Sequence, residues 1–397
     1  MLSAQSTPVV RATLPAVGAA IGDITELFYR NLFAARPELL HDVFNRGNQA
    51  SGEQQKALAG SIAAFAGMLL EEPDARPDAM LARIAHKHAS LGIASDQYKT
   101  VHRHLFAAIA EVLGDAVTDE VASAWDEVYW LMANALIAVE ARLYQEAGTA
   151  EGEVWQRMEI AERRQETPDV VSFLLRPGDG RPAAPFKPGQ YVSVRTELPD
   201  GARQIRQYSL SAAPGRPLWR ISVKRVRGGA GPDGEVSSRL HAHARPGDAL
   251  TVSAPFGDMT LPEGDGPLLL ASAGIGNTPM LAVLGHLAST GSGRRVIAVH
   301  ADRSPADHAH REEQLRLLRA LPDARLHLWY EVPGDRAPEA TAGHADVSGL
   351  ELPGDVTAYL CGPLPFMRAV RGDLLRRGVP AERIHYEVFG PDLWLGR

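Results

Sequence analysis

Apolar residues in the first 150 positions recur at intervals of three and four, the spacing of an α-helix that buries one face. This part of the chain holds only 9 of the 37 glycines and 5 of the 28 prolines, so few helix breakers interrupt the pattern. The pattern predicts an all-α domain, which we place at residues 1–148. Two of its apolar stripes are Leu58, Ile62, Phe65, Leu69 and Val101, Leu105, Ile109, Val112.

The pattern changes after residue 150, where short apolar runs alternate with turns that contain glycine and proline. Many short strands separated by turn signals are typical of an antiparallel barrel. We therefore predict an antiparallel β-barrel domain over residues 152–262. The predicted strands are Val170–Leu175, Tyr191–Val194, Ile205–Leu210, Leu218–Lys224 and Ala249–Ala254.

Strand and helix patterns alternate in the last part of the chain. Such alternation predicts a parallel sheet with helices on both faces. We place this α/β domain at residues 267–397, which gives a multi-domain protein in the order all-α, β-barrel, α/β. The predicted strands are Leu268–Ser272, Val296–His300, Leu326–Tyr330, Ala358–Leu360 and Ile384–Phe389.

Charge and cysteine content narrow the class of protein. The 397 residues include 41 Lys and Arg against 48 Asp and Glu, and a formal net charge of −7 argues against a nucleic-acid partner. No apolar run has the length of a membrane span, and the N-terminus lacks the pattern of a signal peptide. Cys361 is the only cysteine, which excludes internal disulfides and cysteine-ligated zinc or iron–sulfur sites. We expect a cytoplasmic protein whose partners are small molecules.

Four polar side chains lie on the apolar stripes of the helical part: Gln54, His88, Tyr98 and Glu140. Each has an ordinary explanation: a polar residue at a helix start, a hydrogen-bonded core histidine, an amphipathic edge and a solvated rim. A buried carboxylate nevertheless needs a partner, because an unpaired buried charge is costly. The four together predict a functional cavity in which His88 is a candidate metal ligand.

These residues, with Phe28-Tyr29, Pro37-Glu38-Leu39 and Phe44-Asn45, make the helical part resemble the globin domain of bacterial flavohaemoglobins. The resemblance continues through both later domains. It implies haem b with His88 as the iron ligand, and a carboxylate on the imidazole N–H would strengthen that ligand. The resemblance also implies that Tyr29 and Gln54 are donors in the distal pocket and that Leu58 is the apolar residue there. It implies that Phe44 packs on the haem and that Tyr98 and Glu140 hydrogen-bond His88.

Arg206-Gln207-Tyr208-Ser209 resembles the Arg-x-Tyr-Ser signature of ferredoxin-reductase-like flavoproteins. The resemblance implies that the arginine binds the FAD pyrophosphate, the tyrosine packs on the flavin and the serine hydroxyl approaches flavin N5. Tyr191, in the preceding Pro-Gly-Gln-Tyr motif, is implied as a second flavin contact. A helix start with backbone N–H groups and hydroxyls suits a phosphate. The candidate residues there are Gly234, Val236, Ser237 and Ser238.

A glycine-containing turn follows the first strand of the α/β part and leads into a helix, which suits a dinucleotide pyrophosphate. The motif at residues 274–279 departs from the dehydrogenase fingerprint, because Pro279 occupies the region of its last glycine. The later motifs resemble the Cys-Gly-Pro loop and the closing segment of ferredoxin-reductase-like enzymes. The candidate NAD(P)H and flavin residues are Gly274, Ile275, Gly276, Asn277, Thr278, Pro279, Cys361, Gly362, Pro363, Val388, Phe389, Gly390 and Pro391.

The family resemblance implies a nitric oxide dioxygenase. In this reaction NAD(P)H reduces FAD, FAD reduces haem, and O₂ on ferrous haem converts nitric oxide to nitrate. We expect a monomer with intramolecular electron transfer, whose small-molecule partners are O₂, nitric oxide and NAD(P)H. Two alternatives remain: an oxygen-binding or sensing globin kept ferrous by its reductase, and a flavin-dependent ferric or quinone reductase. Asp302 and Arg303 leave NADH and NADPH both open, and Lys87 is either a flavin-facing or a solvated lysine.

Overall fold

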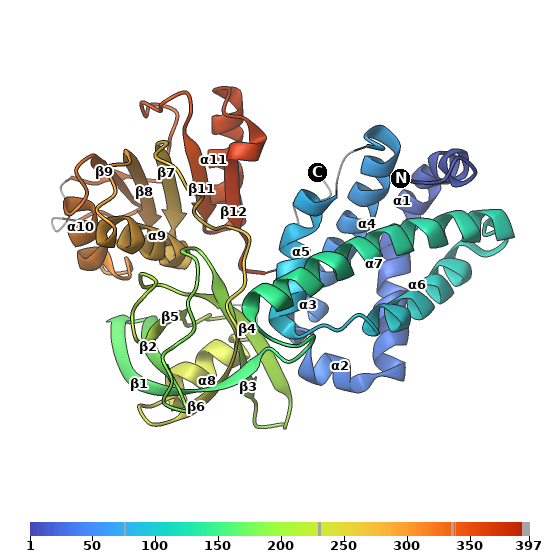
Figure 1. Cartoon of the computed structure of the whole chain (residues 1–397), viewed down its shortest axis with the longest axis horizontal. Coiled ribbons are helices and arrows are strands. Elements are labelled where there is room, and N and C mark those ends of the chain that lie inside the picture. Colours follow the sequence, from blue (N-terminus) through green and yellow to red (C-terminus); the bar gives the residue numbers. More distant parts are fainter. Residues whose placement is uncertain (75–76, 229–231, 335–336, 338, 391–397) are drawn as a thin grey trace. The chain divides into compact units, whose positions relative to one another are not determined.

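The structure is a computed structural model that describes residues 1–74, 77–228, 232–334, 337 and 339–390 (Figure 1). The predicted site residue Pro391 lies outside the described residues. The chain forms two compact units. The first comprises Met1–Trp155 with Arg195–Arg206 and Gly390, and the second comprises Gln156–Val194 and Gln207–Phe389.

The first unit is mainly helical, as the apolar stripes predict. The last of its helices, Asp119–Ala147, is capped at both ends: Thr118 Oγ1 accepts the Val121 N–H at 3.3 Å, and Gly148 follows the helix with φ 67°. Its helices are α1 (Ser6–Ala35), α2 (Pro37–Asp42), α3 (Arg46–Ala50), α4 (Glu53–Glu71), α5 (Asp78–Leu91), α6 (Gln97–Leu113) and α7 (Asp119–Ala147).

The packing of these helices decides where the polar residues meet. Ile24 and Phe28 of α1 are fully buried and share one apolar cluster with Leu105 of α6. Helix α5 packs along α7. His88 of α5 and Glu140 of α7 are therefore brought together although 52 positions separate them.

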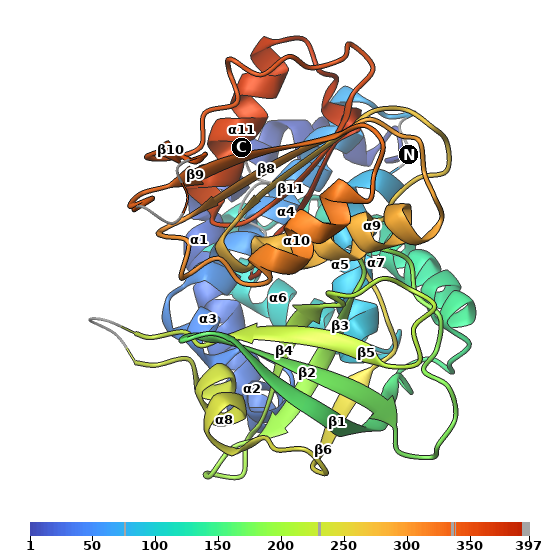
Figure 2. The same cartoon turned by 90° about the vertical axis from the view of Figure 1, so that its left-hand side faces the viewer.

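The antiparallel barrel is confirmed. Its strands follow the order β4-β3-β6-β1-β2-β5 (Figure 2). A bridge between Leu210 and Ile221 joins the two ends of the sheet. Trp219 and Phe173 are fully buried in its interior. The elements are β1 (Trp155–Thr167), β2 (Val170–Pro177), β3 (Tyr191–Glu197), β4 (Arg203–Ser209), β5 (Trp219–Lys224), α8 (Glu235–His243) and β6 (Ala249–Ser253).

Strand β1 is missing from the strands predicted from the sequence. Charged residues occupy much of it, and only Met158, Ile160 and Thr167 are buried. Its pairing with β2 shifts register after Ile160 and again after Gln165, so the inward and outward positions do not alternate regularly. The hydrophobic pattern of the strand is therefore too weak to detect.

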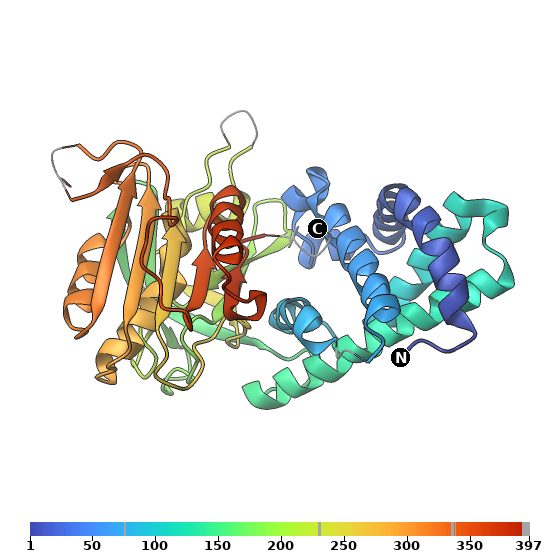
Figure 3. The ribbon, with the colours of Figure 1, turned by 90° about the horizontal axis from the view of Figure 1, so that it is seen from above.

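The α/β part is also confirmed. Its strands follow the order β10-β9-β8-β7-β11-β12, and each pair is parallel. Helices α9 and α10 cover one face and α11 the other (Figure 3). The elements are β7 (Leu268–Ala273), α9 (Asn277–Ser289), β8 (Val296–Asp302), α10 (Arg311–Arg319), β9 (Ala324–Tyr330), β10 (Thr341–Ala342), β11 (Thr357–Cys361), α11 (Leu364–Arg376) and β12 (Ile384–Glu387).

The order of the parallel strands places the predicted dinucleotide motifs at one edge. Strand order reverses between β7 and β11, and ligands of open α/β sheets bind outside the carboxyl ends at such a point. Strand β12 ends two residues earlier than predicted, because Glu387 pairs with Cys361, the last residue of β11. Val388 and Phe389 consequently lie in the loop beyond the sheet edge.

Candidate cofactor sites

The structure brings His88, Tyr98 and Glu140 together from three different helices. Glu140 Oε1 lies 2.9 Å from His88 Nδ1 and accepts the Tyr98 hydroxyl at 2.6 Å. The Tyr98 hydroxyl is also 3.0 Å from His88 Nδ1. An ionised carboxylate only accepts hydrogen bonds, so the imidazole proton sits on Nδ1 and the lone pair on Nε2. The arrangement presents Nε2 as a metal ligand of fixed orientation.

Burial of Glu140 and Tyr98 strengthens the electrostatic interaction between them. Only 2% of Glu140 and 7% of Tyr98 are exposed. Burial, followed by the nearby charge of Glu140, raises the pKa of Tyr98 far above its ordinary value, so the phenol stays protonated and donates. Two donors on one oxygen offset the cost of burying the carboxylate.

A single histidine does not hold an iron ion without other ligands. The described part of the chain contains no group of three or more His, Cys, Asp or Glu side chains that could hold a bare metal ion. His88 therefore fits a metal that arrives with its own ligands, as haem iron does.

The predicted distal residues gather in one apolar cluster. Tyr29 is buried, and its ring centroid lies 5.7 Å from that of Phe44 in an edge-on contact. Leu58 packs against the same cluster. Burial raises the pKa of Tyr29, and a hydrogen bond with Gln54 partly offsets this. The cluster thus presents a protonated hydroxyl donor in apolar surroundings.

The Arg206–Ser209 motif lies on β4 beside β3, as expected. Gln207 Nε2 donates to Ser193 Oγ at 3.1 Å, and Arg206 Nη1 donates to the Ile205 carbonyl at 2.7 Å. Tyr208 packs partly buried against the barrel core. Ser209 Oγ is buried and has no hydrogen-bond partner among the described residues. An unpaired buried hydroxyl is costly, so this one suits a ligand atom.

Tyr191 lies on β3, and its ring packs against Gly257, a residue that was not predicted from the sequence. A Cβ on Gly257 would lie 3.1 Å from Tyr191 Cδ1, and Gly257 has φ 128°. Glycine is therefore required on both steric and conformational grounds. The signal in the sequence is a Pro-Phe-Gly segment shortly after the strand that ends at Ser253.

The helix predicted after Gly234 exists as α8, but its residues differ in what they offer. Ser237 Oγ accepts the Val226 N–H at 3.1 Å and lies 3.1 Å from the Gly234 carbonyl, so this hydroxyl is used locally. Val236 is buried in the barrel core. Ser238 Oγ, in contrast, is buried without a partner among the described residues. Ser238 fits a phosphate contact better than Ser237 or Val236.

The dinucleotide turn and the Cys-Gly-Pro loop are in contact. A Cβ on Gly276 would collide with the carbonyl of Cys361, so only glycine permits this approach. Gly274, Ile275 and Gly276 form a 3₁₀ turn that leads into α9, which begins at Asn277 and includes Thr278 and Pro279.

The residues after β11 and β12 lie at the same edge. Gly362 and Pro363 follow β11, and Val388, Phe389 and Gly390 follow β12. Nearly half of Phe389 is exposed, which leaves its ring available to cover a ligand. Cys361 is fully buried, and burial raises its pKa well above the ordinary value, so it is not a nucleophile.

The structure also places the residues that the sequence left ambiguous. Asp302 Oδ1 accepts the Arg303 N–H at 2.9 Å, and Arg303 Nη2 pairs with Asp307 Oδ1 at 2.5 Å. The charge of Arg303 is thus balanced locally. Lys87 Nζ donates to the Gly390 carbonyl at 3.0 Å, so this lysine has a defined partner.

Two buried histidines near the dinucleotide turn were not predicted. His308 and His310 flank Ala309, whose carbonyl accepts Asn277 Nδ2 at 2.6 Å. Their only sequence signal is a His-Ala-His segment before an amphipathic helix, which also suits an exposed loop.

A helical unit in which a buried carboxylate holds an imidazole, followed along the chain by a barrel and a parallel sheet with flavin and dinucleotide motifs, defines a haem- and flavin-containing oxidoreductase. Residues 26–136 match the family model for globins, and residues 270–372 match that of the oxidoreductase NAD-binding domain. The chain is 45% identical to a flavohemoprotein of Chromobacterium violaceum, over 98% of each chain. It is 42% identical to a flavohemoprotein of Rhizobium meliloti, over 99% of this chain and 100% of that one. The chain therefore belongs to the flavohaemoprotein family.

Solved structures agree with this assignment. A flavohemoglobin of Malassezia yamatoensis, with bound FAD and heme, superposes with a TM-score of 0.89 at 40% identity, over 98% of this chain and 100% of that chain. The FAD/NAD binding domain of a nitric oxide dioxygenase from Vibrio cholerae superposes with a TM-score of 0.56 at 37% identity, over 60% of this chain and all of that one. Haem, FAD and NAD(P)H are thus the cofactors of the class. None of the described helices is long and apolar enough to cross a bilayer.

Proposed function

We propose that the protein is an NAD(P)H-dependent nitric oxide dioxygenase that converts nitric oxide and O₂ to nitrate. The observation that carries the proposal is the contact of Glu140 with His88 Nδ1 at 2.9 Å, reinforced by Tyr98. A carboxylate on this nitrogen makes the imidazole a stronger donor to iron, which favours activation of bound oxygen over storage. The V. cholerae relative, by its name a nitric oxide dioxygenase, supports the same reaction.

When bound, FAD divides the two-electron hydride of NAD(P)H into single electrons, and haem iron supplies the site where O₂ and nitric oxide combine. Within the globin part, His88 Nε2 would hold the iron, and Glu140 would keep the proton on Nδ1. Burial raises the pKa of Tyr29, so the phenol keeps its proton and would donate a hydrogen bond to a molecule bound in this part of the globin.

Residues of the reductase part have positioning roles in this proposal. Ser209 Oγ, Ser238 Oγ and Asn277 Oδ1 are buried and have no partner among the described residues, as expected of groups reserved for cofactor atoms. Arg206 supplies positive charge for the FAD pyrophosphate, and the turn at Gly274–Gly276 allows the dinucleotide backbone to come close. We also propose domains at 1–148, 152–262 and 267–397, a monomeric state and a cytoplasmic location.

The test is a two-stage reaction on the protein loaded with haem and FAD. NADH is first added without oxygen while the haem Soret band is followed, and then O₂ and nitric oxide are admitted and nitrate is measured. We expect haem reduction followed by many nitrate molecules per haem. Reduced flavin beside ferric haem would favour the ferric or quinone reductase, and haem reduction without catalytic nitrate would favour the oxygen-binding globin.

The variant His88→Ala separates these outcomes further. It should lose haem and nitrate formation but retain flavin reduction by NADH, because the reductase residues are untouched. Unchanged nitrate formation in this variant would refute the assignment of His88.

A further inference from the structure

Three consecutive residues lie between β8 and α10: His308, Ala309 and His310. Each of them contacts a different part of the second unit. His308 Nδ1 is 2.7 Å from the Tyr330 hydroxyl, and its ring stacks on His300 with centroids 3.8 Å apart. The Ala309 carbonyl accepts Asn277 Nδ2 at 2.6 Å. All three residues are buried. We call the segment His308–His310 the clasp.

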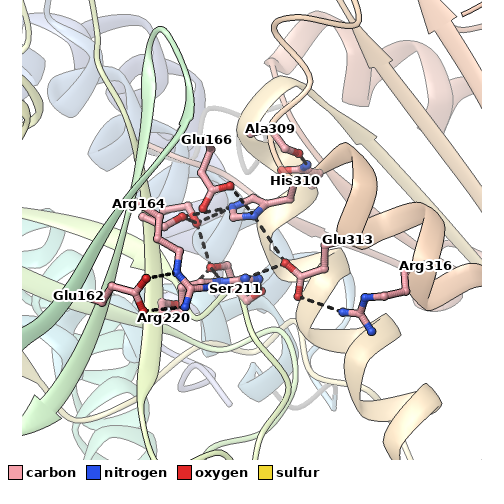
Figure 4. A network of polar contacts seen from close by, with 12 residues as sticks. Glu162, Arg164, Glu166, Ser211, Arg220, Ala309, His310, Glu313 and Arg316 are labelled. Atoms are coloured by element: carbon pink, nitrogen blue, oxygen red, sulfur yellow. Dashed lines mark hydrogen bonds and ion pairs between the residues drawn. The ribbon is translucent and has the colours of Figure 1, made fainter.

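His310 reaches from the α/β part to the barrel (Figure 4). Its Nε2 lies 2.9 Å from Ser222 Oγ on β5, and its Nδ1 lies 3.3 Å from Glu166 Oε2 on β1. Glu313 Oε2 of α10 is 3.6 Å from the same Nδ1. A carboxylate accepts, so Nδ1 carries the proton and Nε2 accepts the Ser222 hydroxyl. Only the His310 tautomer with the proton on Nδ1 satisfies both Glu166 and Ser222.

The barrel side of this contact is itself fixed. Arg220 on β5 is buried, and its Nη1 donates to Glu313 Oε2 at 2.6 Å. Its Nε donates to Ser211 Oγ at 3.1 Å, and Ser211 lies 3.0 Å from Ser222. Arg220 and His310 both contact Glu313, and His310 also contacts Ser222. These contacts form one buried network rather than separate surface pairs.

The backbone of His310 is strained. Its φ is 59°, and it is the one non-glycine residue with positive φ among the residues that the structure describes. This conformation is unfavourable for a residue with a Cβ and persists only where surrounding contacts fix it. Strain held by a buried network indicates that the position of this segment matters.

We propose that the clasp is a positioning device for the hydride donor: it holds the dinucleotide turn at a fixed position relative to the flavin barrel. The connection runs from Ser222 and Glu166 of the barrel through His310 to the Ala309 carbonyl, and from there to Asn277 beside the turn. His310 touches neither flavin nor nicotinamide in this proposal. It sets the distance over which hydride moves, and a misplacement of 1 Å is enough to slow such a step severely. The inference rests on the proposed reductase function.

The test uses two variants of His310. His310→Gly keeps the left-handed backbone but removes the imidazole, and His310→Asn tolerates the same backbone and retains a short polar group. His344→Asn, at an exposed histidine of the same unit, is the matched control. Stopped-flow absorbance gives the limiting rate of FAD reduction and the apparent Kd for NADH, and flavin content and circular dichroism verify folding.

We expect His310→Gly to lower the limiting rate about 10- to 100-fold, with a change of less than threefold in the apparent Kd. The deuterium isotope effect with labelled NADH should rise, because hydride transfer becomes slower than binding. His310→Asn should recover part of the rate. A limiting rate within twofold of the parent in folded His310→Gly, or a loss confined to Kd or flavin content, would overturn the proposal. If His310→Gly does not fold, His310→Asn decides by the same criterion.

A double variant tests the connection through Ala309. If Asn277 and His310 act in one chain of contacts, His310→Gly combined with Asn277→Ala should be no slower than the slower single variant. Losses that multiply would contradict the connection. Flavin reduction by NADH does not involve the globin part, so failure of nitrate formation in the parent leaves this test valid.

Discussion

The group formed by His88, Tyr98 and Glu140 yields the most direct prediction. The nearly isosteric substitution Glu140→Gln removes the negative charge of the carboxylate. The carboxylate oxygen accepts the Tyr98 hydroxyl at 2.6 Å and lies 2.9 Å from His88 Nδ1. Hydrogen bonds to charged groups contribute about 1.5–3 kcal/mol each, and neutral ones about half of that. Glutamine retains an acceptor for the imidazole proton but not the charge.

Outer partners of a metal ligand typically change affinity or activity by about 10- to 100-fold, which corresponds to about 1.4–2.7 kcal/mol. We therefore expect Glu140→Gln to lose haem about 10- to 100-fold faster to an excess of haem acceptor. The iron–histidine stretching frequency of the ferrous protein should fall, and nitric oxide consumption should slow by a similar factor.

Glu146→Gln is the control, since it lies on the same helix with its side chain 57% exposed. It should match the parent in all three assays. Haem loss and nitric oxide consumption within twofold of the parent in Glu140→Gln would refute the role of the carboxylate.

Three further predictions concern other sites. Tyr29→Phe should speed O₂ dissociation about tenfold in stopped-flow measurements, because one donor to the distal ligand is lost; an unchanged rate would show that the hydroxyl is not engaged. Gly276→Ala should weaken NADH binding at least tenfold in titrations, whereas Gly266→Ala, with open space around its Cβ, should not; equal effects would contradict the close approach to Cys361. Burial, followed by a nearby arginine, lowers the pKa of His310 to about 4, below the ordinary value of about 6.5, so the unfolded chain binds the extra proton between these values. Lowering the pH from 7 to 5 should therefore cost the parent about 2 kcal/mol of stability that His310→Asn does not lose. Urea unfolding at both pH values checks this, and a difference in unfolding free energy between parent and variant that does not change with pH would exclude this contribution. The charged groups that face His310 are Glu166, Glu313 and Arg220.

Local patterns were sufficient to predict the fold wherever an element has a regular period. The strands β7 and β8 and helices α4 and α6 follow directly from apolar runs and stripes. Strand β1 could not be predicted, because its burial depends on partners in β2 and its register shifts twice. A single sequence contains no information on such pairings.

The candidate sites divide in the same way. Residues within a motif, such as Arg206 to Ser209, are identifiable because their spacing along one strand determines which side chains point to the same face. Glu140 was found because a carboxylate on an apolar stripe is conspicuous. The clasp was not found, since its meaning lies in contacts between His310 and Ser222, 88 positions apart. Ser237 illustrates the reverse case, in which a hydroxyl that suits a phosphate bonds to its own neighbours.

The burial of Cys361 has a chemical consequence for the proposed reaction, in which nitric oxide is a substrate. Nitrosating and oxidising agents attack exposed thiolates, and this thiol is both fully buried and held protonated by its raised pKa. The chain has no other cysteine. Cys361 therefore offers reactive nitrogen species no accessible thiolate, and under the proposed function the activity should survive exposures that inactivate enzymes with accessible thiols.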